Sequence, residues 1–133
     1  VTFDDGRTLG GYHNLSHHGK DEVKLSRLEE IETAQMELFG DFLRDLKSVN
    51  EVDGNLLDNT MVLYGCHMGD ANIHNNSNLP VILAGGGFQH GQHLTFNSQN
   101  NTPLCNVFVS MLQKMGVETD RFASSTGSLT GLV

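Results

Sequence analysis

The stretch from residue 21 to residue 48 constrains the fold more than any other part of the sequence. Its apolar side chains recur every three or four positions, which is the spacing of one face of an α-helix. Asp21 stands where a helix N-cap or a first-turn acid belongs, and the Asp53–Gly54 pair marks a turn soon after the last apolar position. We therefore predict a long amphipathic helix over about 21–48, with its apolar face at Leu25, Leu28, Ile31, Leu38, Phe39, Phe42 and Leu46.

Two short apolar runs follow this helix, at Met61–Gly65 and at Leu79–Ala84. Each is bounded by turn residues and glycine, which indicates a buried strand, and Pro80 fits only at a strand's start or edge. We expect a strand–loop–strand unit over 60–87, followed by a polar loop over 88–101.

A second helix is predicted over about 102–116. Thr102 suits its N-cap, Pro103 suits its first helical position, and Gly116 suits its end. The tail that follows is rich in Ser, Thr and Gly, and we expect it to be irregular.

The order helix, strand, strand, helix is typical of an α/β protein. With 133 residues the chain has room for one domain, and we expect residues 1–133 to form part of a layered α/β sandwich. A hydrophobic fraction of 38% with 18% charged residues fits a globular chain. The formal net charge of −8 argues against nucleic-acid binding, and no apolar run approaches the roughly 18 residues of a membrane span.

All seven histidines fall in predicted loops, and several of these loops follow strands. In an open α/β sheet, ligands bind at the carboxyl ends of the strands, where the loops 65–78 and 85–93 would emerge. Neutral imidazole is a common metal ligand, and mixed His, Asp and Asn surroundings suit zinc, iron or manganese. The histidines are His13, His17, His18, His67, His74, His90 and His93.

The densest histidine group lies in a loop predicted over residues 1–20, where His13 and His17 are four positions apart and His18 follows. Two imidazoles at this spacing can converge on one metal ion if the segment makes a single turn. The alternative is a loop whose histidines hydrogen-bond backbone carbonyls and cap the next helix. The residues alone favour neither.

The remaining histidines lie in the loops after the two strands. His67, at the carboxyl end of the first strand, is either a metal ligand or a hydrogen-bonded loop histidine. Asp70 either supports a site or shapes a turn, with the turn favoured, and His74 lies in an Asn-rich loop. His90 and His93 suit a substrate pocket or the surface better than a metal site.

Two other features bear on chemistry. The glycines Gly85–Gly87 follow the second strand, but neither the Gly-x-Gly-x-x-Gly pattern nor the Lys-Ser/Thr pair of phosphate-binding loops comes after them, so the signal for phosphate binding is weak. Cys66 neighbours His67, but adjacent side chains at a strand end point apart and no orienting acid is evident, so a cysteine nucleophile is not predicted. Cys66 and Cys105 are instead interpreted as small buried side chains.

Several stretches resemble the C-terminal part of an uncharacterised bacterial family, domain of unknown function 1552. The resemblance covers nearly the whole chain and is carried by residues 12–19, 57–63, 78–87, 90–93 and 122–127. That family in turn resembles the alkaline phosphatase and sulfatase superfamily, whose members hydrolyse esters with one or two metal ions. The resemblance implies the C-terminal portion of an alkaline-phosphatase-like α/β/α sandwich, and it implies an exported or periplasmic protein.

Three superfamily signatures carry over in order. The Asp-x-x-x-His metal pair resembles His13-x-x-x-His17, and a later ligand histidine resembles His74. The strand that ends in Asp-His-Gly resembles Leu63–Gly69, with His67 at the Asp position. The resemblance thus implies metal ligands among His13, His17, His67 and His74, and we assign His18, His90, His93 and Asp70 to substrate binding.

The sequence departs from the superfamily at the ligands. His replaces Asp at positions 13 and 67, and Met68 stands where a second ligand is expected, which implies one nitrogen-rich site at most for a divalent transition metal. The superfamily's nucleophile and first Asp ligand belong to the N-terminal half of its domain. Val1 begins the chain without an initiator Met, which is compatible with a fragment, a mature chain or a proteolytic product. The resemblance implies that the chain lacks the N-terminal half, and we therefore expect it to be inactive alone.

Two functions are compatible with these features. The first is a metal-dependent hydrolase of small phosphate or sulfate esters, complete only with the missing half of the domain. The second is a non-catalytic exported module that binds a metal or a glycan-like ligand, or that is structural. A protein purified without metal would exclude the hydrolase, and if metal is present, turnover of aryl phosphate and sulfate esters separates the two functions.

Overall fold

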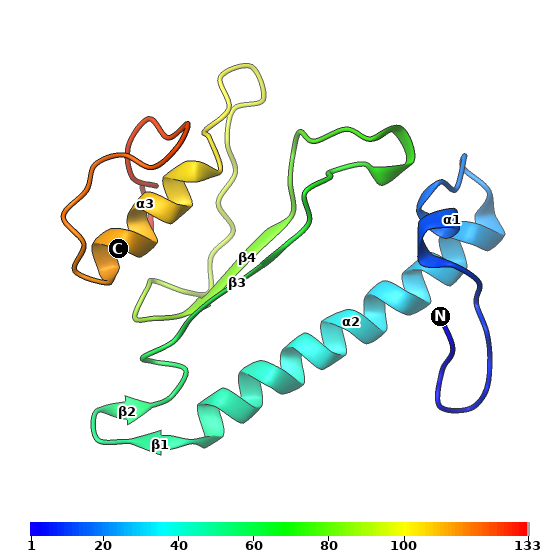
Figure 1. The fold of residues 1–133 in the computed structure, drawn as a ribbon, viewed down its shortest axis with the longest axis horizontal. Coiled ribbons are helices and arrows are strands. Elements are labelled where there is room, and N and C mark those ends of the chain that lie inside the picture. The colour runs from blue at the N-terminus through cyan, green and yellow to red at the C-terminus, as the bar shows by residue number, and fades with distance from the viewer. Residues whose placement is uncertain (133) are drawn as a thin grey trace. The chain divides into compact units, whose positions relative to one another are not determined.

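The computed structural model of the chain describes residues 1–132 (Figure 1). These residues divide into two compact units, the first made of residues 1–46 and 64–81 and the second of residues 47–63 and 82–132. In chain order the elements are α1 (Tyr12–Ser16), α2 (Glu22–Ser48), β1 (Asn50–Glu51), β2 (Gly54–Asn55), β3 (Met61–Gly65), the 3-10 turn η1 (Ala71–Ile73), β4 (Val81–Gly85) and α3 (Cys105–Lys114).

Helix α2 spans Glu22–Ser48, close to the stretch where the apolar periodicity predicts a helix. Asp21 is its N-cap, because the carboxylate accepts the backbone N–H groups of Val23 at 2.9 Å and Lys24 at 3.0 Å. The expected buried face is only partly buried: Ile31 is the one buried residue of the helix, while the side chain of Leu38 is 69% exposed.

The first unit has a small apolar core. Leu9 and Leu15 from the N-terminal segment are buried with Ile31 of α2, and Phe3 and Leu28 pack against them. This core holds the segment before α2 on the first turns of that helix.

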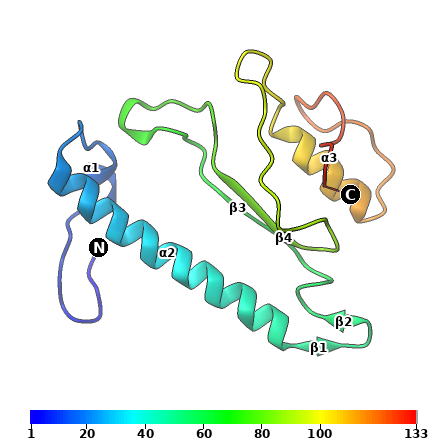
Figure 2. The same ribbon diagram turned by 180° about the vertical axis from the view of Figure 1, so that it is seen from behind.

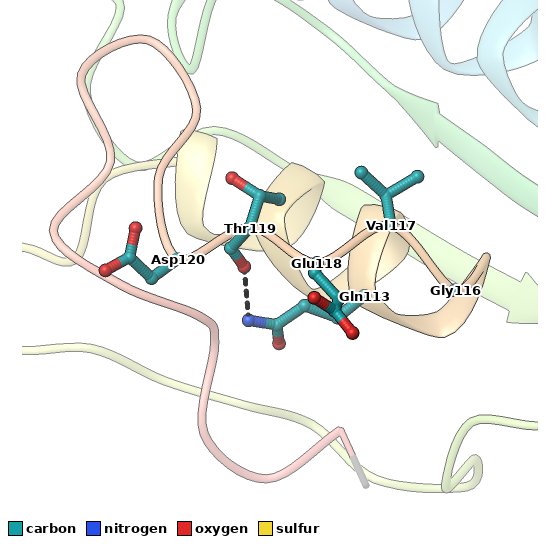
Figure 3. Close-up of a pocket in the computed structure, with 6 residues that line it drawn as sticks. All are labelled: Gln113, Gly116, Val117, Glu118, Thr119 and Asp120. Atoms are coloured by element: carbon teal, nitrogen blue, oxygen red, sulfur yellow. Dashed lines mark hydrogen bonds between the residues drawn. The ribbon is translucent and has the colours of Figure 1, made fainter.

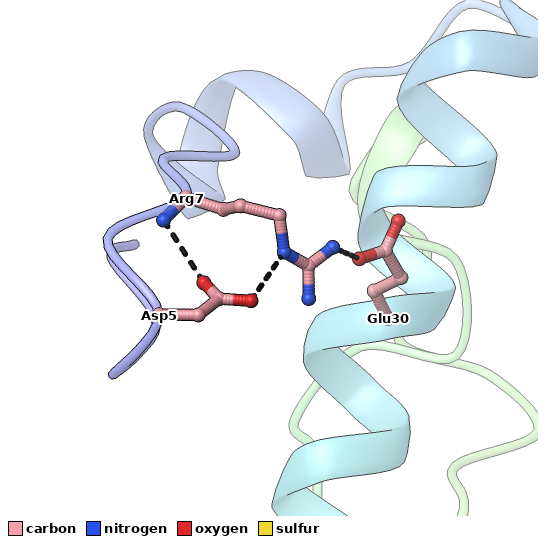
Figure 4. A network of polar contacts seen from close by, with 3 residues as sticks. All are labelled: Asp5, Arg7 and Glu30. Atoms are coloured by element: carbon pink, nitrogen blue, oxygen red, sulfur yellow. Dashed lines mark hydrogen bonds and ion pairs between the residues drawn. The ribbon is translucent and has the colours of Figure 1, made fainter.

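A polar network reinforces the same junction (Figure 4). The Arg7 guanidinium pairs with Asp5 at 2.7 Å and with Glu30 of α2 at 3.0 Å, and it lies 5.2 Å from the centre of the Phe3 ring. Because all three charged groups are well exposed, the pairs orient the segment more than they stabilise it.

Strands β3 and β4 lie side by side as a two-stranded sheet in both views of the ribbon (Figures 1 and 2). Gly65, at the end of β3, lies against the main chain of Pro80, and Gly86, just beyond the end of β4, donates its N–H to Leu57 before the start of β3. The pairing is therefore antiparallel. The strands occur where expected but are partly exposed rather than buried.

Antiparallel pairing changes the expected position of the loops. The loop after β3 and the loop after β4 leave from opposite ends of the ladder, whereas the sequence interpretation placed both at one sheet edge. The described residues show a mixed helical and short-stranded fold with two two-stranded sheets, the second being the β1–β2 hairpin.

Helix α3 is shorter than its expected range of 102–116. Its N-cap is Leu104, which has helical backbone angles and no side-chain cap bond, so the predicted cap at Thr102 is wrong. Its end is as expected: Gly116 has a φ of 82°, and Val117 N–H donates to the Leu112 carbonyl at 3.0 Å. This left-handed glycine closes a Schellman motif.

Two buried polar residues of α3 hold the C-terminal tail. The Asn106 side-chain carbonyl accepts the backbone N–H of Thr126 at 2.9 Å, and the Ser110 hydroxyl accepts that of Leu129 at 2.8 Å. The tail has no helix or strand within its described residues, as expected, yet it folds back along α3 (Figure 2). It thereby completes the core of the second unit, formed by Phe88, Val107, Leu129 and Leu132.

Two further expectations can be compared with these residues. Cys66 is exposed and Cys105 is partly buried, so the interpretation of both as buried side chains is wrong. Within residues 1–132, no helix is long and apolar enough to cross a membrane.

The glycines at 85–87 are explained by packing. All three have positive φ angles, of 70°, 63° and 68°. A Cβ atom on Gly85 would overlap the main-chain carbonyl oxygens of Leu57 and Thr60, whereas one on Gly87 would meet only the flexible end of Lys114. The run is thus required where the chain leaves β4 and passes close to the segment before β3.

This difference predicts that two matched substitutions lower the free energy of unfolding by different amounts. Gly87→Ala should destabilise the protein by about 1–2 kcal/mol, because alanine is strained at positive φ. Gly85→Ala should cost a further ~1–3 kcal/mol, because main chain must move to admit the methyl group. Urea denaturation of the two variants measures the difference, and equal losses of stability would contradict the packing explanation.

The cap of α2 predicts a pH dependence. The backbone N–H groups of Lys24 and Val23 hold the pKa of the Asp21 carboxyl below its ordinary value. A lowered folded-state pKa means that the stabilisation is present above the unfolded-state pKa and is lost as the pH falls through the folded-state pKa. Asp21→Asn keeps an oxygen acceptor but has no charge to lose. The stability advantage of the wild type over this variant should therefore be present at neutral pH and shrink in acid, whereas a pH-independent difference would contradict the assignment.

Candidate metal centre

Three of the four predicted metal ligands gather in the first unit: His13, His17 and His74, called the histidine triplet below. The ring centroids of His13 and His17 are 4.7 Å apart, and those of His17 and His74 are also 4.7 Å apart. Both contacts are edge to face, at interplanar angles of 75° and 79°. His17 is therefore the central ring of the triplet.

Helix α1 places the first two rings together. His13 lies within this short helix and His17 is its C-cap, so the expectation that every histidine lies in a loop is wrong for His13. Residues four apart on a helical turn lie on the same face, which brings the two imidazoles into contact. The Lys24 ammonium donates to the His17 carbonyl at 3.2 Å and so satisfies the end of the helix.

The loop over residues 66–80 brings the third ring. A bridge between Asp70 and Asn75 closes this loop, and the Asp70 carboxylate accepts the Asn72 N–H at 3.0 Å to cap η1. His74 follows η1 with a φ of 53°, a left-handed conformation that ends the turn. Asp70 thus shapes the turn, which is the alternative favoured from the sequence.

Asn72 joins this loop to the segment after α1. Its backbone carbonyl lies 3.3 Å from Nδ1 of His17, and its side-chain Oδ1 accepts the Gly19 N–H at 2.8 Å. Because a carbonyl oxygen can only accept, the first contact requires the proton of His17 on Nδ1. The lone pair of neutral His17 is then on Nε2, as in most histidines that bind metals.

His18 has the opposite arrangement. Its Nδ1 accepts the backbone N–H of Lys20 at 3.0 Å, so the neutral ring carries its proton on Nε2. The side chain is partly buried. Nε2 of neutral His18 is therefore the nitrogen that can donate a hydrogen bond, and the substrate-binding role of His18 stays a prediction.

The imidazoles of the triplet are of the donor type that transition metals prefer, and its two ring contacts have nearly the separation of imidazoles that share one ion. Imidazoles that share a tetrahedral ion at metal–nitrogen distances of about 2.0–2.1 Å have ring centroids roughly 5 Å apart. Among residues 1–132, however, no three His, Cys, Asp or Glu side chains are placed to hold a metal ion. A shared ion would require the rings to move, and both outer rings of the triplet are exposed.

The other predicted site residues are not in this group. His67 is exposed in the bend after β3, and within the part of the chain that the structure describes it makes no ring contact with the triplet. His90 and His93 belong to the second unit. There the Nε2–H of His90 donates to the carbonyl of Gly85 at 2.9 Å, and His93 is exposed.

The second unit also has a surface hollow at the end of α3 (Figure 3). The Gln113 side-chain amide donates to the Thr119 carbonyl at 2.7 Å across it, and the acidic side chains of Glu118 and Asp120 lie at its border. It contains none of the predicted site residues.

Two residues near the triplet were missed from the sequence. Asn72 had one available signal, the Asp70-x-Asn72 spacing that commonly forms a side-chain-capped turn. No sequence signal pointed to Tyr12, because the groups near its phenol belong to residues that are distant in sequence. Partial burial raises the pKa of the Tyr12 phenol, and the nearby groups of Glu32, Cys66 and Tyr64 raise it further.

The raised pKa of Tyr12 predicts a late tyrosine titration. Ultraviolet absorbance against pH should therefore show a phenol that ionises above the ordinary tyrosine pKa. Tyr12→Phe should remove that late phase and leave the other tyrosine. Persistence of the late phase in this variant would show that the surroundings of Tyr12 are wrongly described.

Comparison with known proteins found no matching family model, no matching curated protein and no matching solved structure. The resemblance to domain of unknown function 1552 therefore stays a prediction. A function for the chain has to be argued from the geometry of the histidine triplet and its surroundings.

Proposed function

We propose that this chain supplies the metal-binding part of a hydrolase that acts on phosphate or sulfate esters. The observation that carries the proposal is the contact of His17 with both His13 and His74, at ring separations suited to one shared ion. The Nδ1 contact of His17 with the Asn72 carbonyl supports it, because it leaves Nε2 free to bind. An alkaline-phosphatase-like sandwich and an exported location are part of the same proposal.

The residues divide the chemistry between them. A divalent ion held by His13, His17 and His74 would polarise an ester oxygen and favour attack on phosphorus or sulfur. The Nε2–H of His18 would donate a hydrogen bond to another oxygen of the ester, since its Nδ1 already accepts from Lys20. The attacking group is expected from the N-terminal half of the domain, as the resemblance implies.

A second candidate is a non-catalytic module that binds a metal or another ligand. The observation in its favour is the exposure of His13 and His74, because a catalytic ion is more often held in a shielded cavity. Turnover of aryl phosphate or aryl sulfate esters by the zinc-loaded protein, together with the N-terminal half of its domain, separates the two. Equal turnover by a His67→Ala variant would remove His67 from the mechanism.

The proposal predicts stoichiometric binding of zinc. Calorimetric titration with Zn²⁺ should give a ratio close to one ion per chain. His17→Ala removes the central ring, and it should weaken binding by more than the ~10–100-fold that loss of an outer hydrogen-bond partner costs.

His93→Ala is the matched control, because it removes an exposed imidazole of the second unit and should leave the affinity unchanged. Two results would sink the proposed metal centre: zinc binding that is absent from the wild type, or an equal loss of affinity in the His17 and His93 variants.

A further inference from the structure

We infer that Asn72 is a positioning residue that sets the tautomer of His17. The inference rests on the proposed function for its consequence, the orientation of a metal ligand, but the tautomer itself can be measured without metal. Asn72 lies at the middle of η1, two residues before His74 in the 66–80 loop. It thereby links two members of the histidine triplet that are far apart in sequence.

Two of the hydrogen bonds of Asn72 act in concert. The Oδ1 contact with the Gly19 N–H, at 2.8 Å, fixes where η1 lies against the segment that follows α1. With η1 fixed, the Asn72 carbonyl is 3.3 Å from Nδ1 of His17, close enough to accept its proton. The side chain of Asn72 thus fixes the position of η1, and the main-chain carbonyl of the same residue selects the tautomer of His17.

The conformation of the turn makes this arrangement rigid. The Asn72 N–H is bound by the Asp70 carboxylate at 3.0 Å, and the Asp70–Asn75 bridge closes the turn around it. The carbonyl of Asn72 therefore cannot rotate away without opening η1. Without such an acceptor, a neutral imidazole is a mixture of two tautomers, with the proton on Nδ1 or on Nε2. A metal ion then binds only the tautomer whose lone pair is on the coordinating nitrogen.

The same contact also restricts the ring itself. His17 is partly buried, and its ring centroid lies 4.7 Å from that of His13 and 4.7 Å from that of His74. A hydrogen bond at Nδ1 fixes the remaining rotation of the ring, so that Nε2 points in one direction. Loss of the Asn72 anchor should therefore release both the tautomer and the orientation of His17.

Substitution of the Asn72 side chain tests the inference. Asn72→Ala removes the Oδ1 acceptor but keeps the backbone carbonyl, whereas Asn72→Asp restores an Oδ1 acceptor. Asn76→Ala is the matched control, because Asn76 is an exposed amide side chain in the same loop.

The primary readout is the tautomer of His17, from nitrogen-15 chemical shifts of the imidazoles in metal-free protein above the ordinary histidine pKa. The wild type, Asn72→Asp and Asn76→Ala should show the proton on Nδ1, and Asn72→Ala should shift toward a mixture. An unchanged His17 tautomer in folded Asn72→Ala would overturn the inference. So would a wild type with its proton on Nε2.

Zinc affinity is the second readout. Asn72→Ala should weaken binding by about 10–100-fold, the usual cost of losing a group that orients a ligand, and Asn72→Asp should recover the affinity. A residue that only stabilises the loop would change the unfolding midpoint without changing the tautomer, and that pattern also overturns the inference. If zinc fails to bind the wild type, the proposed function falls, and the tautomer measurement still decides the role of Asn72.

Discussion

The antiparallel pairing of β3 and β4 is the constraint on which the candidate site depends. Because the strands run in opposite directions, the 66–80 loop must turn back on itself within a short length of chain. The Asp70–Asn75 bridge and η1 make that reversal, and they fix where His74 leaves the turn. A parallel pair would have needed a crossover connection between the two strands, and His74 would then have had other residues around it.

The histidine triplet shows how a site can be assembled with little burial. Most of its order comes from hydrogen bonds: Lys24 to the end of α1, Asn72 to the segment after α1, and Asp70 to its own turn. The nearby apolar core of Leu9, Leu15 and Ile31 is small, and its part is to hold α1 on α2. Polar contacts of this kind are directional, so they fix proton positions and ring orientations, which apolar packing alone does not.

The features predictable from sequence were those set by neighbours along the chain. The periodicity of α2, the cap at Asp21 and the left-handed end at Gly116 are local properties, and the structure contains each of them. Strand direction was not predictable in this way, because the apolar runs of a parallel and an antiparallel pair look alike when partly buried. The contact of His17 with His74 depends on that direction, so the sequence could predict candidate ligands without showing which of their rings meet.

The open face of α2 has a consequence for the motions of the chain. Ile31 is the buried residue of this helix, while Leu38 and Phe42 further along are largely in water. A helix opens most easily where few tertiary contacts oppose the loss of its backbone hydrogen bonds. The Phe39–Tyr64 ring contact, at a centroid distance of 4.9 Å, is a tertiary contact in this part of the helix, but the neighbouring side chains are exposed. Amide protons around Leu38 and Phe42 should therefore exchange with solvent faster than those near Ile31. His13 and His17 belong to the segment that precedes α2, so they are separated in the chain from the half of the helix that opens more easily.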